Sequence, residues 1–113
     1  MVKVLFAEQG TIDDLRATIE QVLDAATTTR RAGVALARPY LAGTGLFPER
    51  SHVNVLVWRF LYDLHGTIEE WARWALEHIS SWQDTAPDDT KRAAAVAAWE
   101  TAIAGHDPRT PAA

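Results

Sequence analysis

Two long segments of this chain repeat core-type residues, most of them apolar, at spacings of mainly three and four positions, which predicts two long helices. In the first segment, which begins at Thr11, steps of three and four residues alternate throughout. This spacing is typical of a coiled-coil seam. At about 1.5 Å per residue, the first helix would be roughly 45 Å long. Its seam positions are Ile12, Leu15, Ile19, Val22, Ala26, Thr29, Gly33, Leu36 and Tyr40.

Local signals mark where each helix begins and ends. Thr11 is followed three residues later by Asp14, a pair that can cap the first helix. Residues 41–48 contain two glycines and end at Pro48, which is favourable in the first turn of the second helix. A third helix is expected from Pro87 to Ala104, with acidic residues at its N-terminal end. The short link predicts that the two long helices form an antiparallel hairpin.

The second long segment has more apolar surface than a hairpin can bury. Its seam is Val53, Val57, Phe60, Leu64, Trp71, Ala75, His78 and Trp82, and Leu56, Leu61, Ile68 and Trp74 lie beside it. Gly66 lies inside this pattern and should weaken or bend the helix. A homodimer would cover the surplus apolar surface. We expect its interface to contain Val53, Val57, Phe60, Leu61, Leu64, Ile68 and Trp71.

These patterns predict an all-α fold, with a long antiparallel helical hairpin and short N-terminal and C-terminal helices in a dimeric four-helix bundle. Residues 1–104 would form one helical domain and residues 105–113 a disordered tail. A hydrophobic fraction of 48% excludes a disordered chain, and the absence of cysteine excludes a disulfide framework. The net charge of −4 disfavours nucleic acid as a direct partner. Without a signal peptide or membrane span, we expect a cytoplasmic protein.

Aromatic residues are the main candidates for a binding site, because five tryptophans are unusual in 113 residues. The favoured interpretation is structural, since tryptophan fills cores and interfaces. The alternative is an aromatic pocket for a planar or hydrophobic ligand, and the two are compatible in a dimer. The candidate ligand-binding residues are Trp58, Tyr62, Trp71, Trp74, Trp82 and Tyr40.

Catalytic and metal-binding patterns are weak. Glu49 and His52 have the Glu-x-x-His spacing of carboxylate metal sites, but the sequence contains no second copy. No nucleophile motif or phosphate loop is present, so we expect no enzyme activity and no cofactor. His65 and Glu69, one turn apart, predict an ordinary surface pair. Arg30, Arg31 and Arg38 predict a solvated basic face.

Two stretches resemble a known family. The first is Val4-Leu5-Phe6-Ala7-Glu8-Gln9-Gly10-Thr11, followed by Asp14-Leu15. The second is Phe47-Pro48-Glu49-Arg50 with Val53-Asn54, leading to Trp71-Ala72-Arg73-Trp74-Ala75. Together, over roughly residues 2 to 82, they resemble the C-terminal helical domain of PadR-like transcriptional regulators.

The resemblance implies a regulatory dimerisation domain, which in some members of the family senses aromatic or hydrophobic effectors. The family's winged helix would precede this region, so DNA contact is expected only through a winged-helix domain outside this sequence. Two alternatives remain open. One is a freestanding helical bundle that binds a small molecule, and the other is the ligand-binding half of a TetR-like regulator.

Overall fold

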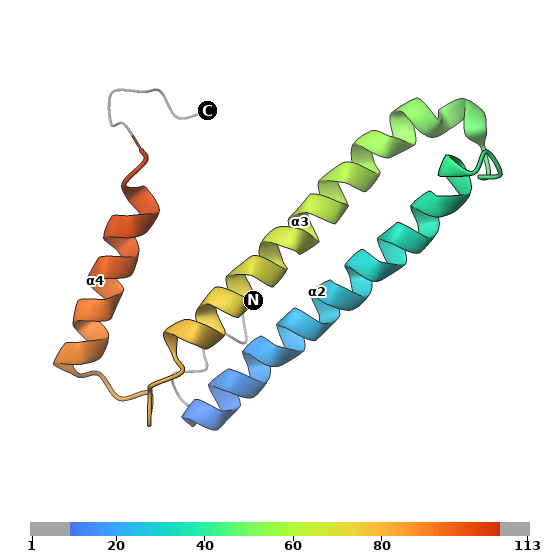
Figure 1. Cartoon of the computed structure of the whole chain (residues 1–113). Coiled ribbons are helices and arrows are strands. Elements are labelled where there is room, and N and C mark those ends of the chain that lie inside the picture. The colour runs from blue at the N-terminus through green and yellow to red at the C-terminus, as the bar shows by residue number, and fades with distance from the viewer. Residues whose placement is uncertain (1–9, 107–113) are drawn as a thin grey trace.

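The computed structural model describes residues 10–106, and the regular structure in this range is entirely helical. The elements are α2 (Ile12–Leu41), the short 3-10 turn η2 (Pro48–Arg50), α3 (Ser51–His78) and α4 (Asp89–Ile103). Helices α2 and α3 lie side by side as a long antiparallel hairpin, and α4 stands apart from it (Figure 1). The predicted all-α class and hairpin are confirmed for this range. The expected N-terminal helix and most of the expected tail lie outside the described residues.

The helix starts follow the expected capping chemistry. The Thr11 hydroxyl accepts a hydrogen bond from the Asp14 backbone N–H at 3.0 Å, and the Asp14 carboxylate accepts one from the Thr11 N–H at 3.2 Å. This reciprocal pair satisfies two N–H groups that have no partner within the helix. At α4, the Asp88 carboxylate accepts a hydrogen bond from the Lys91 N–H at 2.7 Å. Pro48 begins η2 rather than an α-helix, and α3 starts three residues later.

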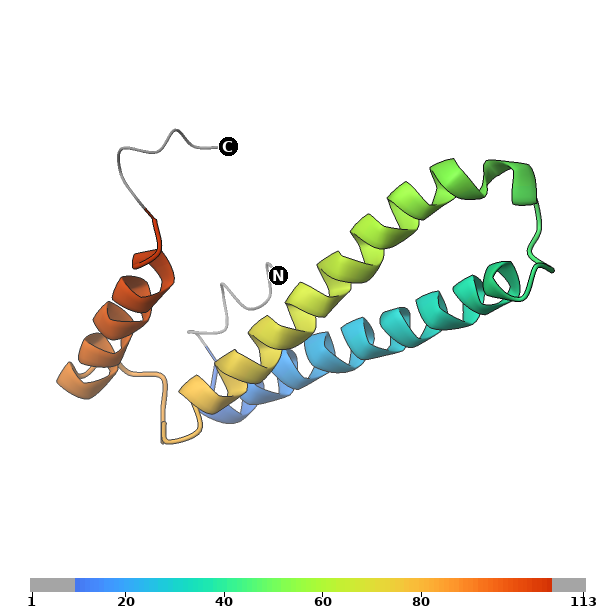
Figure 2. The same ribbon diagram turned by 45° about the horizontal axis from the view of Figure 1, so that its top comes forward.

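The loop between α2 and α3 folds back over the end of α2. The Tyr40 hydroxyl donates a hydrogen bond to the Leu46 carbonyl, and the Tyr40 ring lies against Gly45. A Cβ atom at Gly45 would lie 2.5 Å from that ring, so only glycine fits there without a shift. The two helices are close at their opposite ends and diverge toward this loop, as Figure 2 shows. We call the loop end the open end and the other end the base.

The buried core is small and lies toward the base. Ile19 of α2 packs with Ala72, Ala75 and Ile79, and all four are at most 6% exposed. Half-buried apolar residues surround this cluster, and Trp71 is one of them. Because the buried residues are few and mostly small, the core of one chain offers little apolar burial.

In the N-terminal half of α3, the residues that meet α2 lie outside the apolar seam, whereas at the base Ala75 of that seam is buried in the core. Burial follows a heptad spacing that starts at Trp58, whereas Val53, Val57, Phe60 and Leu64 are exposed. Apolar content alone defines the apolar seam, and it does not identify the polar and small residues that contact α2. We call this contact with α2 the inner seam, and its heptad positions are Trp58, Tyr62, His65, Glu69, Ala72, Leu76 and Ile79.

Helix α4 is joined to the base by a short polar link. The Lys91 ammonium donates hydrogen bonds to the Asp84 carboxylate at 2.8 Å and to the Asp88 carboxylate at 3.0 Å, and it lies 5.6 Å from the centre of the Trp82 ring. The larger apolar residues of α4, including Trp99, remain exposed. Among residues 10–106, no helix combines the length and apolar character that crossing a membrane requires.

Candidate functional site

A continuous exposed apolar surface lies along the N-terminal half of α3. Six large side chains form it, and each is between 42% and 68% exposed. We call this surface the outer stripe, and its residues are Val53, Leu56, Val57, Phe60, Leu61 and Leu64. A patch of six such residues is on the order of several hundred Å², near the largest that monomers usually expose.

The outer stripe and the inner seam lie on opposite faces of α3. At 100° per residue, Val53, Val57, Phe60 and Leu64 fall within about 60° of one another around the helix axis. Trp58 and Tyr62 fall on the other side of the axis, where they contact α2. Helix α3 therefore has one face that α2 covers and one apolar face that no described residue covers.

Five of the seven predicted interface residues belong to the outer stripe. Ile68 is half-buried beside α2, where it lines a shallow hollow with Val22 and Ala26. Trp71 packs against the core of the hairpin. Ile68 and Trp71 differ from the other five because the buried face of α3 shifts gradually around the helix toward the base. There it includes positions that lie outside the heptad positions of the inner seam.

A cavity of about 470 Å³ lies between α2 and α3 at the open end, where the helices diverge. Two predicted ligand-binding residues, Tyr40 and Trp58, line it. Its walls combine four aliphatic and two aromatic side chains with the Ser51 hydroxyl and the Asn54 amide, which suits an apolar ligand with a polar group. The remaining lining residues are Leu36, Ala37, Leu41, Ser51, Asn54 and Val55.

The predicted aromatic residues do not converge on a single pocket. Trp58 stacks on Tyr62 with ring centres 4.8 Å apart, next to the open end. Trp74 stacks on His78 at 4.8 Å, and His78 meets Trp82 edge-on at 6.1 Å, near the link to α4. The structure thus divides the aromatic set into one group at the open end and one at the base, and Trp71 is half-buried against the core.

A buried charged cluster crosses the hairpin at Glu69, and the sequence did not predict it. Glu69 is 5% exposed and accepts hydrogen bonds from the Thr27 hydroxyl at 2.9 Å and from Arg30 at 2.7 Å. A longer contact of 3.4 Å joins it to Arg73. The predicted surface pair of His65 and Glu69 is wrong, because Glu69 points into the hairpin contact.

Arg30 is likewise not part of a solvated face. Its guanidinium lies 4.1 Å from the centre of the Tyr62 ring, and a Cβ atom at Gly66 would be 3.3 Å from its Cζ atom. Gly66 therefore gives the guanidinium room to reach Glu69. The signal that could have revealed this cluster was the heptad spacing from Trp58 through Tyr62 to Glu69, because polar residues can occupy seam positions when they find partners.

The pKa values of this cluster follow from its contacts. The Arg30 hydrogen bond, and then that of Thr27, hold the pKa of the Glu69 carboxyl below its ordinary 4.5, and desolvation opposes them. The same hydrogen bond raises the pKa of Arg30 above its ordinary value. Glu69 and Arg30 therefore stay charged at neutral pH and act as a fixed ion pair.

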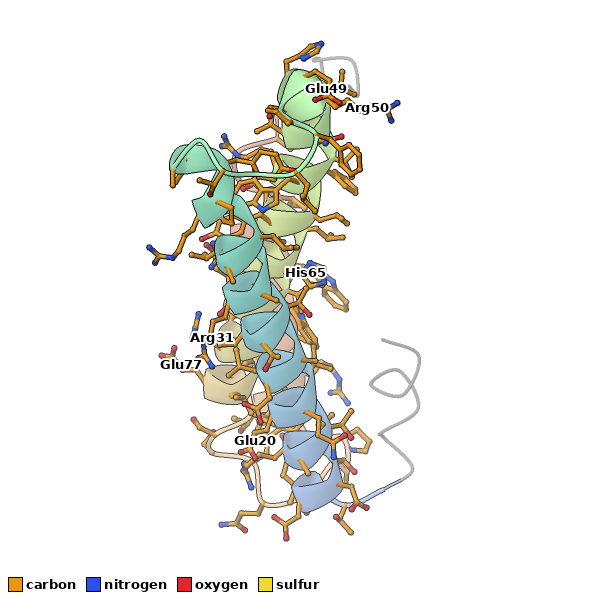
Figure 3. The ribbon with its side chains drawn as sticks, turned by 90° about the vertical axis from the view of Figure 1, so that its right-hand side faces the viewer. Glu20, Arg31, Glu49, Arg50, His65 and Glu77 are labelled. Atoms are coloured by element: carbon orange, nitrogen blue, oxygen red, sulfur yellow. The ribbon has the colours of Figure 1, made fainter. Side chains whose placement is uncertain are left out.

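The Glu49 and His52 pair lies at the loop end, on η2 and on the first turn of α3. Figure 3 shows Glu49 beside Arg50 at this tip, whereas His65 lies about half-way along the hairpin. Within residues 10–106, no group of three or more histidine and acidic side chains is close enough to hold a metal ion.

In comparison with known proteins, no family model matches this chain, and no curated protein or solved structure shows detectable similarity to it. The likeness to PadR-like regulators therefore rests only on the residues quoted for it. Two features of the hairpin are candidates for function, namely the outer stripe and the cavity at the open end.

Proposed function

We propose that this chain is a regulatory homodimerisation domain, in which the outer stripes of two copies form a shared core. The observation that supports this function is the apolar face of α3, whose six large side chains remain 42–68% exposed in the single chain. A second copy would give each stripe an apolar partner and complete a four-helix arrangement. The resemblance to PadR-like regulators, whose helical domain dimerises, supports the same class.

The test is the mass of the protein in solution. We expect sedimentation at micromolar concentration to give twice the chain mass of 12.5 kDa. Phe60→Glu, at the middle of the stripe, should give a monomer, because it places a charge in an apolar contact. Leu41→Glu is the matched control, since Leu41 is 87% exposed but lies outside the stripe.

A monomeric wild-type chain would overturn the proposal. A dimer that both substitutions leave intact would place the interface elsewhere on the molecule. Circular dichroism should report unchanged helix content in both variants, since neither side chain is buried within the hairpin.

The cavity at the open end favours a second role, binding of a small hydrophobic effector. Its volume of about 470 Å³ lies in the usual range for ligand pockets, and Trp58 within it provides a fluorescent reporter. This role is compatible with dimerisation, because the cavity and the outer stripe lie on opposite faces of α3. It is also the role expected of a freestanding binding protein.

Substitution of a residue that lines the cavity, compared with the same substitution outside it, tests whether the ligand binds in the cavity. Ala37→Phe should fill the cavity and abolish binding of planar aromatic compounds, measured by tryptophan fluorescence or calorimetry. Ala35→Phe is the control, because Ala35 is exposed and does not line the cavity. Equal binding by both variants would show that the ligand does not enter here.

A further inference from the structure

The residues of the outer stripe are arranged symmetrically about one point in the sequence, which is not a general property of exposed apolar patches. Its six residues form three pairs, and both members of each pair are equally far along the chain from the point between Trp58 and Arg59. All six are large apolar side chains that remain exposed in the single chain. The pairs are Val53 with Leu64, Leu56 with Leu61, and Val57 with Phe60.

This symmetry matters for a helix that meets a second copy of itself in the opposite direction. In such a pair, a twofold axis places each residue level with the one equally far on the other side of the midpoint. Val57 of one copy is then level with Phe60 of the other, and Val53 is level with Leu64. Each valine faces a larger side chain, so the two surfaces can interdigitate.

The flanks of the stripe fit the same arrangement. At 100° per residue, Leu56 and Leu61 lie on opposite sides of the central line of Val53, Val57, Phe60 and Leu64. Each edge of the contact therefore receives two copies of one leucine. Arg59 and Asp63 are exposed and form an ion pair with each other at 2.7 Å. The proposed dimer therefore does not require either charge to be buried without a partner.

We propose that two copies of this chain pair through the outer stripes of α3 in antiparallel orientation. The twofold axis lies at the level along α3 that is midway between Trp58 and Arg59. This rests on the proposed dimerisation function and specifies its geometry. The open ends of the two hairpins overlap at the centre of the dimer, and the bases point away from each other. With about 1.5 Å per residue, the two bases lie roughly 60 Å apart. The dimer therefore holds apart whatever is attached at its two bases.

The absence of cysteine allows spin labels to be placed singly on the full chain. We choose Arg59→Cys and Glu70→Cys, because both side chains are exposed and outside the stripe. The distance between the two labels of a dimer is then measured by electron double resonance. Position 59 lies next to the proposed axis, and position 70 lies more than eleven residues from it. The antiparallel pair therefore predicts an axial separation of about 35 Å at position 70 and about 2 Å at position 59.

Each outcome decides between arrangements. A short distance at position 59 with a long distance at position 70 supports the antiparallel pair. Similar distances at both positions indicate a parallel pair, which overturns this geometry and leaves dimerisation standing. A long distance at position 59 in a chain that sediments as a dimer places the contact elsewhere and also overturns it. A monomer without dipolar coupling would overturn both the geometry and the proposed function.

Phe60→Glu, added to each labelled chain, is the control for the origin of the signal. Under the proposal it removes the short distance at position 59, and Leu41→Glu leaves that distance unchanged. A short distance that survives Phe60→Glu would arise from a contact outside the stripe and would count against the proposal.

Discussion

At the scale of single residues, one buried carboxylate links the two long helices through hydrogen bonds. Glu69 occupies an inner-seam position where an apolar residue would be ordinary, and Thr27 and Arg30 from α2 satisfy it. A polar group at a seam position favours the one register in which its partners are level with it. We therefore assign Glu69 a role in the alignment of α2 against α3.

Glu69→Gln tests this role. The amide keeps the size but loses the charge that Arg30 pairs with, so we expect a loss of about 2 kcal/mol in the free energy of unfolding. Asp63→Asn is the matched control, because Asp63 pairs with Arg59 on the surface and should cost less than about 0.5 kcal/mol. Urea denaturation of both variants measures the difference. Equal losses would show that the buried pair contributes no more than the exposed one.

The pH dependence of stability gives a second test of Glu69. Its pKa is lowered in the folded chain from the ordinary 4.5, chiefly by the Arg30 hydrogen bond and then by Thr27. The unfolded chain therefore binds more protons between the two pKa values. The stability that Glu69 contributes should be complete above pH 4.5 and lost as the pH falls through the folded pKa. In thermal denaturation, the difference in Tm between wild type and Glu69→Gln should thus become smaller as the pH is lowered from 7 to 3.

At the scale of elements, the three helices differ in how much of their stability comes from packing. Helices α2 and α3 share the core and the Glu69 cluster. Helix α4 has 15 residues, none of them buried, and Lys91 connects its start to the link. An isolated helix of this length is marginal in water, although its alanines favour it.

Hydrogen exchange should separate α4 from the hairpin. We expect backbone amides of α4 to exchange at least about 100-fold faster than those of α2 and α3 near Ile19 and Ala72, because opening α4 breaks few contacts. Mass spectrometry of peptides from each helix measures this. Similar protection in α4 and the hairpin would mean that α4 packs against another surface, for example on a second copy.

At the scale of the whole molecule, the chain is elongated and has little core of its own. Its principal extents are 57 × 40 × 20 Å, and among residues 10–106 the exposed large apolar residues outnumber the buried apolar ones. A core shared between two chains would supply the missing burial. The stability of such a chain depends on its concentration.

Thermal unfolding should therefore depend on protein concentration. We expect the Tm of the wild type to rise by a few degrees for each tenfold increase in concentration, because only the folded state dimerises. Phe60→Glu should remove the dependence and lower the Tm at high concentration. Differential scanning calorimetry over a hundredfold range measures both effects, and a constant wild-type Tm would contradict a shared core.

Much of the fold could be predicted from local chemistry. Capping at Thr11 and the three-and-four spacing depend on neighbours in the chain, and the helices that they predict are confirmed. The glycines and proline of residues 41–48 correctly predict a break between the helices, but Pro48 begins η2 and α3 starts at Ser51. The candidate site was less predictable. The cavity brings Tyr40 to Trp58 and leaves Trp74 and Trp82 at the base, which depends on how far the helices diverge.

The sequence by itself determined the two long helices, the cap at Thr11 and the excess of apolar surface on α3, because periodicity and capping are local properties. It did not determine every boundary, since α3 begins at Ser51 rather than at Pro48. Only the tertiary structure decided which face of α3 meets α2. Apolar content singles out the face with Val53 and Phe60 but does not say which face meets α2, and in the structure α2 covers the face with Glu69. Thr27 and Arg30 satisfy that carboxylate, and Gly66 admits the guanidinium. A pairing between residues some forty positions apart exists only once the hairpin has formed.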